Sequence, residues 1–148
     1  PPHYQKLIRV GMAIKQAISL NGEALAHPYE EDLSFLYGTI FIESSKNSQV
    51  DSCNVCVFAN GQLDRSPTGS GVSARLAIHH SRKEWALNHW MTIESILGTQ
   101  FKCQIKELVK FSNYDAIIPI VQGQAFYTGK NEFWIDPKDP LSGGFELR

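Results

Sequence analysis

Residues 64–77 read DRSPTGSGVSARLA, and the rest of the chain is organised around this stretch. Pro67 fixes its own φ and keeps Ser66 out of the helical region, so a helix can begin only after the proline. Either Thr68 or Ser70 can then cap that helix, because a hydroxyl accepts hydrogen bonds from the first free N–H groups. The stretch therefore predicts a loop that runs directly into a helix.

The start of this helix is suited to an anionic ligand. Gly69 and Gly71 have no Cβ, so a ligand can approach the backbone closely. The free N–H groups and the positive end of the helix dipole favour a carboxylate or a phosphate. An ordinary capped helix would carry similar signals, but Asp64 and two hydroxyls around the same turn favour a binding site. No lysine follows the glycines, which excludes a P-loop.

Composition and charge are those of a soluble globular protein with one core. The chain has 148 residues, of which 43% are hydrophobic and 20% charged. A formal net charge of −1 argues against nucleic acid or a membrane surface as the partner. No apolar run approaches the roughly 20 residues that span a bilayer. We expect a single lobe over residues 1–148, and the opening Pro1-Pro2-His3 is typical of a piece cut from a longer protein.

The cysteines predict neither a disulfide framework nor a metal site. Cys53 and Cys56 lie in a run that reads as a strand, where a separation of three places them on opposite faces. Neither a second C-x-x-C nor a histidine pair at zinc spacing accompanies them, and the adjacent His79 and His80 point to different sides of a helix. We interpret Cys53, Cys56 and Cys103 as reduced thiols, which fits a cytoplasmic protein.

Hydrophobic periodicity predicts an α+β fold. A stripe at Leu7, Val10, Ile14 and Ile18 predicts a helix over residues 4–20, ended by Asn21-Gly22. Runs of β-branched and aromatic residues predict strands at residues 36–42, 53–58, 92–96, 101–108, 116–121, 124–127 and 132–135. Pro119 predicts an edge strand or a bulge in its run, and residues 136–140 predict a rigid turn.

The helix that follows residues 64–71 is apolar on two sides. Val72 and Leu76 lie on one side, and Ala74 and Ile78 lie on the other. Because a helix of this kind is usually buried, we expect a central helix with a sheet wrapped round it.

A nucleotide site is the first alternative for the glycines. Gly69, Gly71 and Ala74 fit the dinucleotide fingerprint G-x-G-x-x-A, with Glu94 twenty residues beyond the alanine. The fingerprint requires a strand that runs straight into the first glycine. Here a turn at Asn60-Gly61 and Pro67 stand between them, and the chain downstream reads as antiparallel β, so the fingerprint is set aside.

Residues 64–75 resemble the second active-site motif of the proline racemase and hydroxyproline epimerase family. In that family the position of Thr68 is usually a catalytic cysteine, and a threonine there resembles the branch of trans-3-hydroxy-L-proline dehydratases. The similarity continues over most of the chain, in residues 95–101 (SILGTQF), 118–119 (IP), 123–129 (GQAFYTG) and 135–141 (IDPKDPL).

The resemblance implies one lobe of a two-lobed fold similar to that of diaminopimelate epimerase, with the ligand held between the lobes. This chain would be the second, C-terminal lobe. Its partner would be a missing N-terminal lobe with the catalytic cysteine in a Cys-Gly-His-like motif, which this sequence lacks. The tail, residues 131–148, would pack on that first lobe. A cyclic amino acid is the implied substrate, and the resemblance allows a homodimer.

The implied chemistry is abstraction of the α-proton of that substrate without a cofactor. The backbone N–H groups of Gly69, Ser70 and Gly71 would stabilise the charge that develops on its carboxylate. Asp64 would bind the substrate amine. Thr68 has no thiolate-like state and should be unable to return the proton as a second base. The resemblance implies a different outcome, in which the 3-hydroxyl leaves as water and pyrroline-2-carboxylate is formed.

Two other functions remain open at the level of sequence. One is a proline racemase or hydroxyproline epimerase. The other is a non-catalytic module that binds an amino acid or a carboxylate at the same helix start.

Overall fold

A computed structural model describes residues 3–20 and 25–145, which form one sheet with a helix on each face. The helices are α1, Tyr4–Ser19, and α2, Gly69–Ser81. A short 3-10 helix, η2, covers Glu31–Leu33. The strands are β1 (Gly38–Glu43), β2 (Ser52–Phe58), β3 (Gln62–Leu63), β4 (Met91–Ser95), β5 (Gln100–Phe111) and β6 (Tyr114–Gln122).

The sheet has the order β1-β2-β4-β5-β6, and β3 pairs with β2 beside this path. Neighbouring strands are antiparallel except β2 and β4, which run parallel with Ser52 opposite Ile93. The chain leaves β2, turns through β3 and returns through α2 to β4, so α2 is the crossover of a parallel pair. The strands downstream of α2 pair with one another in antiparallel fashion, as expected, whereas the parallel pairing of β4 with β2 was not predicted.

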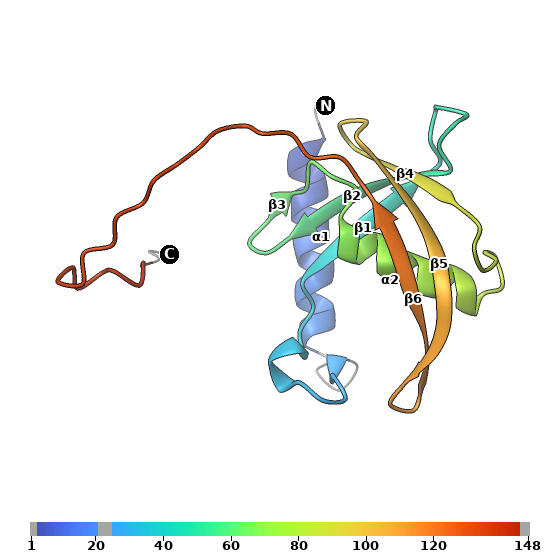
Figure 1. Cartoon of the computed structure of the whole chain (residues 1–148), viewed down its shortest axis with the longest axis horizontal. Coiled ribbons are helices and arrows are strands. Elements are labelled where there is room, and N and C mark those ends of the chain that lie inside the picture. The colour runs from blue at the N-terminus through green and yellow to red at the C-terminus, as the bar shows by residue number, and fades with distance from the viewer. Residues whose placement is uncertain (1–2, 21–24, 146–148) are drawn as a thin grey trace.

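The core lies between α2 and the sheet. Val72 and Leu76 of α2 are fully buried against residues of β4 and β5, namely Met91, Ile93, Cys103 and Ile105. Figure 1 shows β5 and β6 curving past this helix. The α+β fold with a sheet around a helix is therefore confirmed. The opposite side of α2 is not covered, since Ala74 and Ile78 are exposed, so the expectation that both sides are buried is wrong for this chain.

Helix α1 covers the other face of the sheet, but not through the expected stripe. The predicted helix is confirmed, and its contact point is the buried Gly11, on which an added Cβ would lie 2.8 Å from Val57 Cβ of β2. Val10, Ile14 and Ile18 are 36–41% exposed instead. A glycine contributes nothing to hydrophobic periodicity, although it allows the closest approach of helix and strand. The predicted end at Asn21-Gly22 lies outside the described residues.

The long hairpin of β5 and β6 follows the sequence closely. Phe101, Cys103 and Ile105 face inward while Lys102 and Lys106 are exposed, as their alternation predicts. β6 is an edge strand, and the register shifts opposite Pro119, between Ile105 and Glu107. The edge strand is therefore confirmed. The bulge lies opposite Pro119, with the extra residue Lys106 in β5 and not in the run of Pro119 itself.

After Gln122 the described chain forms no helix or strand and extends away from the sheet (Figure 1). The strands predicted at residues 124–127 and 132–135 are therefore wrong. Their aromatic side chains are almost fully exposed, as in Tyr127 and Trp134. The predicted turn is present, with the Asp139 N–H donating to the Asp136 carbonyl over 3.0 Å. Neither helix in the described residues combines the length and apolarity that a membrane crossing needs.

Candidate functional site

The loop between β3 and α2 brings two of the predicted site residues into contact. Asp64 is placed by its own N–H, which donates to the Cys56 carbonyl of β2 over 3.0 Å. Its carboxylate accepts one hydrogen bond from the Ser66 N–H and one from the Thr68 Oγ1 hydroxyl, each over 2.8 Å. The first is an Asx turn that closes the loop on itself. The carboxylate therefore holds Thr68 at the entrance of the helix.

Thr68 occupies the N-cap position of α2, as predicted, but it does not cap the helix with its hydroxyl. Its φ is +68° and ψ is 103°, an uncommon conformation for a β-branched residue. The hydroxyl donates to Asp64, and the backbone carbonyl accepts the first helical bond, from the Val72 N–H over 2.8 Å. The capping prediction for the Thr68 hydroxyl is therefore wrong. The donation to Asp64 takes the hydroxyl away from the N–H groups.

The N–H groups of Gly69, Ser70 and Gly71 precede that first helical bond, so helix geometry gives them no acceptor within the helix. The two glycines differ in their surroundings. A Cβ on Gly69 would have no neighbouring atom within 4 Å, whereas on Gly71 it would meet Ile40 of β1. The open space beside Gly69 leaves room for a ligand. At Gly71 the absence of a side chain is instead required by the close packing against Ile40. Ser70 is exposed.

The thiols of this lobe are held in the protonated form. Burial raises the pKa of Cys103 and, with the hydrogen bond to the Glu94 carboxylate, that of Cys53, in each case to about 11. Burial also raises the pKa of Cys56, where the Thr68 hydroxyl lowers it and the Asp64 charge raises it further. The hydrogen bonds from Cys53 and Ser45 lower the pKa of Glu94. None of these thiols is prepared to act as a base near neutral pH.

Sequence reasoning missed two buried residues behind the loop, Asn54 of β2 and Arg75 of α2. The Asn54 Nδ2 group donates to the Pro67 carbonyl over 2.9 Å, and Arg75 Nη1 donates to Asn54 Oδ1 over 2.6 Å. A signal was present in the sequence. Asn54 stands at an inward position of a strand, and Arg75 lies beside Leu76 in an apolar helix, so each places a polar group where burial is expected.

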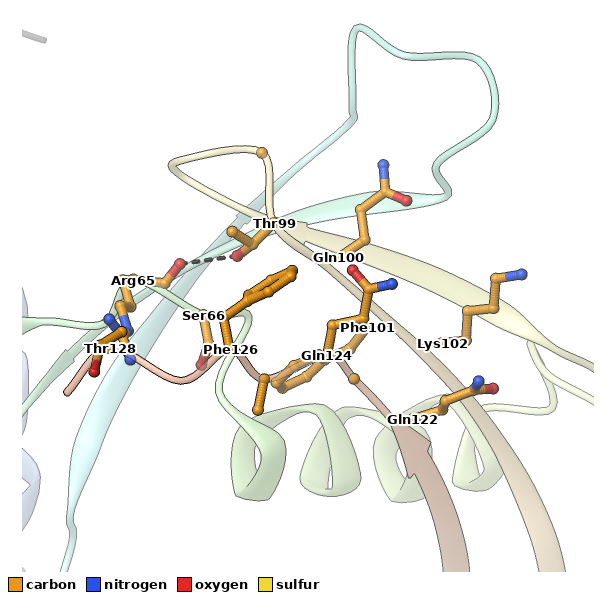
Figure 2. Close-up of a pocket in the computed structure, with 13 residues that line it drawn as sticks. Arg65, Ser66, Thr99, Gln100, Phe101, Lys102, Gln122, Gln124, Phe126 and Thr128 are labelled. Atoms are coloured by element: carbon orange, nitrogen blue, oxygen red, sulfur yellow. Dashed lines mark hydrogen bonds between the residues drawn. The ribbon is translucent and has the colours of Figure 1, made fainter. Parts of the chain in front are cut away.

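A hollow of about 710 Å³ lies beside the loop, not over it. Figure 2 shows its walls, which come from the turn into β5 and from the chain that leaves β6, with Arg65 and Ser66 at one end. The Thr99 hydroxyl donates to the Arg65 carbonyl over 2.9 Å and joins these parts. Ser66 is the link to the site, because its hydroxyl also accepts from the Thr68 N–H over 3.1 Å. Asp64 and Thr68 do not line the hollow.

No group of three or more potential metal ligands occurs within residues 3–20 and 25–145. His79 instead contacts Glu84, with 2.7 Å between Nδ1 and Oε2.

Comparison with known proteins identifies the family. The family model described as proline racemase matches residues 1–146. The chain is 51% identical over 148 residues to a trans-3-hydroxy-L-proline dehydratase of Colwellia psychrerythraea, covering 100% of this chain and 41% of the relative. It is 36% identical over 152 residues to the proline racemase of Clostridioides difficile, covering 100% of this chain and 44% of that protein. The chain thus spans about two fifths of the length of these relatives.

The fold is likewise that of one lobe of a solved relative. A hydroxyproline epimerase from Agrobacterium vitis, with trans-4-hydroxy-L-proline bound, superposes with a TM-score of 0.81 at 28% identity. The match covers 99% of this chain and 42% of the epimerase. Together with the family model and the sequence relatives, this match shows that the chain belongs to the proline racemase family.

Proposed function

We propose that this chain is the second lobe of a trans-3-hydroxy-L-proline dehydratase and supplies half of its active site. One observation carries the proposal: the hydrogen bond between Thr68 and Asp64 at the open start of α2. A threonine stands where the family usually has a thiol, so the lobe offers polar groups for binding but no second base. The identity of 51% to the Colwellia dehydratase supports the same reading.

Different residues at the start of α2 can bind different groups of the substrate. The N–H groups at residues 69–71 can donate hydrogen bonds to the substrate carboxylate and stabilise the charge that develops on it when the α-proton leaves. Asp64 uses two of its roughly four acceptor positions within the loop, which leaves capacity for the substrate amine. The Thr68 hydrogen is directed to Asp64, so its oxygen offers lone pairs to a donor on the substrate.

The reaction balances with one base. A thiolate of the first lobe removes the α-proton, and the C–H electron pair forms a double bond between C2 and C3 as the bond between C3 and its hydroxyl breaks. The thiol returns the proton to the departing hydroxyl, which leaves as water. The cyclic product then becomes pyrroline-2-carboxylate. Thr68 can help to bind the ring on the face opposite that base, but it cannot return a proton to the α-carbon.

The test uses a full-length enzyme that contains this lobe. Incubation with trans-3-hydroxy-L-proline should give a cyclic imine, which is the substrate minus water. The imine is trapped, and mass spectrometry identifies it by the mass of the trapped product. L-proline and 4-hydroxyproline in deuterated water serve as the matched alternatives, because a racemase or epimerase would introduce deuterium at the α-carbon. Deuterium exchange without imine would replace the dehydratase by a racemase or epimerase. Binding without either product would indicate a non-catalytic module.

A further inference from the structure

A buried arginine and a buried asparagine lie behind the loop that carries Thr68. Arg75 is 8% exposed and Asn54 is fully buried. The guanidinium donates through Nη1 to Asn54 Oδ1 over 2.6 Å and contacts His79 Nε2 through Nη2 over 3.3 Å. Within the described residues it forms no ion pair, and its Nε has no partner. A buried charge without a counter-charge is costly, so this one calls for an explanation beyond packing.

The arginine fixes the orientation of the Asn54 amide. A guanidinium only donates hydrogen bonds, so the amide oxygen must face it. The amide nitrogen is thereby directed to the Pro67 carbonyl, 2.9 Å away. On the other side of Arg75, His79 Nε2 accepts, so its proton lies on Nδ1 and faces Glu84 Oε2 at 2.7 Å. These hydrogen bonds thus form a series from Glu84 at the surface, through His79, Arg75 and Asn54, to the Pro67 carbonyl at the entrance of α2.

That backbone is the peptide between Pro67 and Thr68, and it is held at both ends. Asn54 binds its carbonyl, and the Ser66 hydroxyl accepts from its N–H over 3.1 Å. Thr68 follows with a φ of +68°, which a β-branched residue adopts only where its surroundings impose it. The peptide on the other side of Thr68 is held too, because the Thr68 carbonyl accepts from the Val72 N–H over 2.8 Å. With both flanking peptides held, the backbone of Thr68 and the direction of its Cα–Cβ bond are fixed.

We propose that Asn54 and Arg75 are positioning residues that hold Thr68 in its left-handed conformation and so aim its hydroxyl at Asp64. Neither side chain reaches the start of α2 itself. They act through the Pro67 carbonyl. The consequence for turnover rests on the proposed function, whereas the consequence for the conformation of Thr68 does not.

Asn54→Asp in the full-length enzyme separates positioning from packing. Aspartate has the same shape and keeps an oxygen toward Arg75, but it removes the donor to the Pro67 carbonyl. Asn60→Asp makes the same chemical change at an exposed turn and is the matched control. We expect kcat for trans-3-hydroxy-L-proline to fall roughly ten- to hundredfold, with KM within about threefold, since misplacing a group near the chemistry affects turnover most. The ¹³Cβ and amide resonances of Thr68 should move in Asn54→Asp and stay in place in Asn60→Asp.

The two readouts keep the two proposals apart. If the enzyme does not dehydrate the substrate, the Thr68 resonances still decide whether Asn54 positions this residue. If Asn54→Asp folds and leaves both the resonances and kcat unchanged, the positioning role is overturned. If that variant does not fold, Arg75→Lys decides: it keeps the charge but not the planar fork, so it should shift the same resonances. Unchanged resonances in a folded Arg75→Lys would equally overturn the proposal.

Discussion

The hydrogen bond between Thr68 and Asp64 changes what each side chain can do. A free threonine hydroxyl at a helix start would cap the helix, but here it donates to a carboxylate over 2.8 Å. The carboxylate also closes the loop through the Ser66 N–H. Asp64 is therefore a structural anchor of the loop as well as the proposed partner of the substrate amine, and substitution should affect both roles.

Asp64→Asn tests this pair. The amide oxygen can still accept from the Ser66 N–H, but the amide nitrogen is a donor, so the hydrogen bond with the Thr68 hydroxyl must reverse its direction and the charge is lost. We expect kcat/KM of the full-length enzyme to fall by at least roughly 2 kcal/mol in transition-state stabilisation, the scale for a lost charge-assisted bond. The fold should survive, with a modest fall in the unfolding midpoint, because the loop loses the charge that both hydrogen bonds rely on. Near-normal kinetics would mean that Asp64 serves the loop alone.

Thr68→Cys restores the thiol that the family usually has. We expect the variant of the full-length enzyme to gain deuterium exchange at the α-carbon of 3-hydroxyproline, because a thiol can return a proton there. The gain should be small, since the Asp64 charge beside it disfavours the thiolate. Thr68→Ala is the companion variant and should retain substantial dehydration if Thr68 only positions the substrate. A cysteine variant that binds substrate but shows no exchange would contradict the placement of Thr68 opposite the first-lobe base.

At the scale of elements, the contact between α1 and β2 depends on one missing side chain. Gly11 lies directly on Val57, which is fully buried and, being β-branched, has little freedom to move aside. Gly11→Ala should destabilise the full-length protein by about 1 kcal/mol, because overpacking typically costs 1–3 kcal/mol and the gain in helix propensity offsets about 1 kcal/mol of that. Gly69→Ala is the control, since its Cβ would enter open space.

Denaturant unfolding measures both glycine variants. We expect the midpoint to fall for Gly11→Ala and to stay within error for Gly69→Ala. Equal midpoints for the two would mean that α1 moves away from the sheet without loss of stability.

Sequence patterns predicted those elements whose side chains are buried by their own partners. Both long helices and the five long strands were found, because alternation and apolar runs report burial on a pleated or helical surface. The runs near Phe126 and Trp134 have the same composition, but they lie beyond the edge strand β6 and have no backbone partner in the described chain. Composition reports what a side chain favours, not whether a neighbouring strand exists.

In the candidate site, too, the sequence predicted the residues that act locally and missed the partners that are distant in the chain. The 64–71 stretch located Asp64, Thr68 and the helix start, because glycine, proline and hydroxyl residues act locally through their own backbone. Asn54 and Arg75 were missed as partners of the loop, since the contact between β2 and α2 joins residues 21 positions apart. Periodicity can mark such a polar residue as inward-facing, but it cannot name the group that it meets.

At the scale of the whole molecule, this chain alone should not dehydrate the substrate. Its cysteines are held protonated, with pKa values of about 11 for Cys53 and Cys103. A raised pKa lowers the thiolate fraction at any pH below it, so these thiols should react slowly with iodoacetamide at pH 8. Alkylation of the full-length enzyme should therefore inactivate it at a cysteine outside residues 53–103, mapped by peptide mass spectrometry. Activity of the isolated chain that is lost on substituting one of its own cysteines would contradict this division.

The chain after β6 extends away from the sheet and carries exposed aromatic side chains. Phe126, Phe133 and Trp134 are 80–89% exposed, an apolar surface of the kind that marks an interface. If residues 131–148 pack on the first lobe, trypsin should cut after Lys130 rapidly in the isolated chain and slowly in the full-length enzyme, because an ordered and covered backbone resists cleavage. Cleavage after Lys83, an exposed residue beyond the end of α2, gives an internal reference in both proteins. Equal rates after Lys130, relative to that reference, would show that the tail stays uncovered when the first lobe is present.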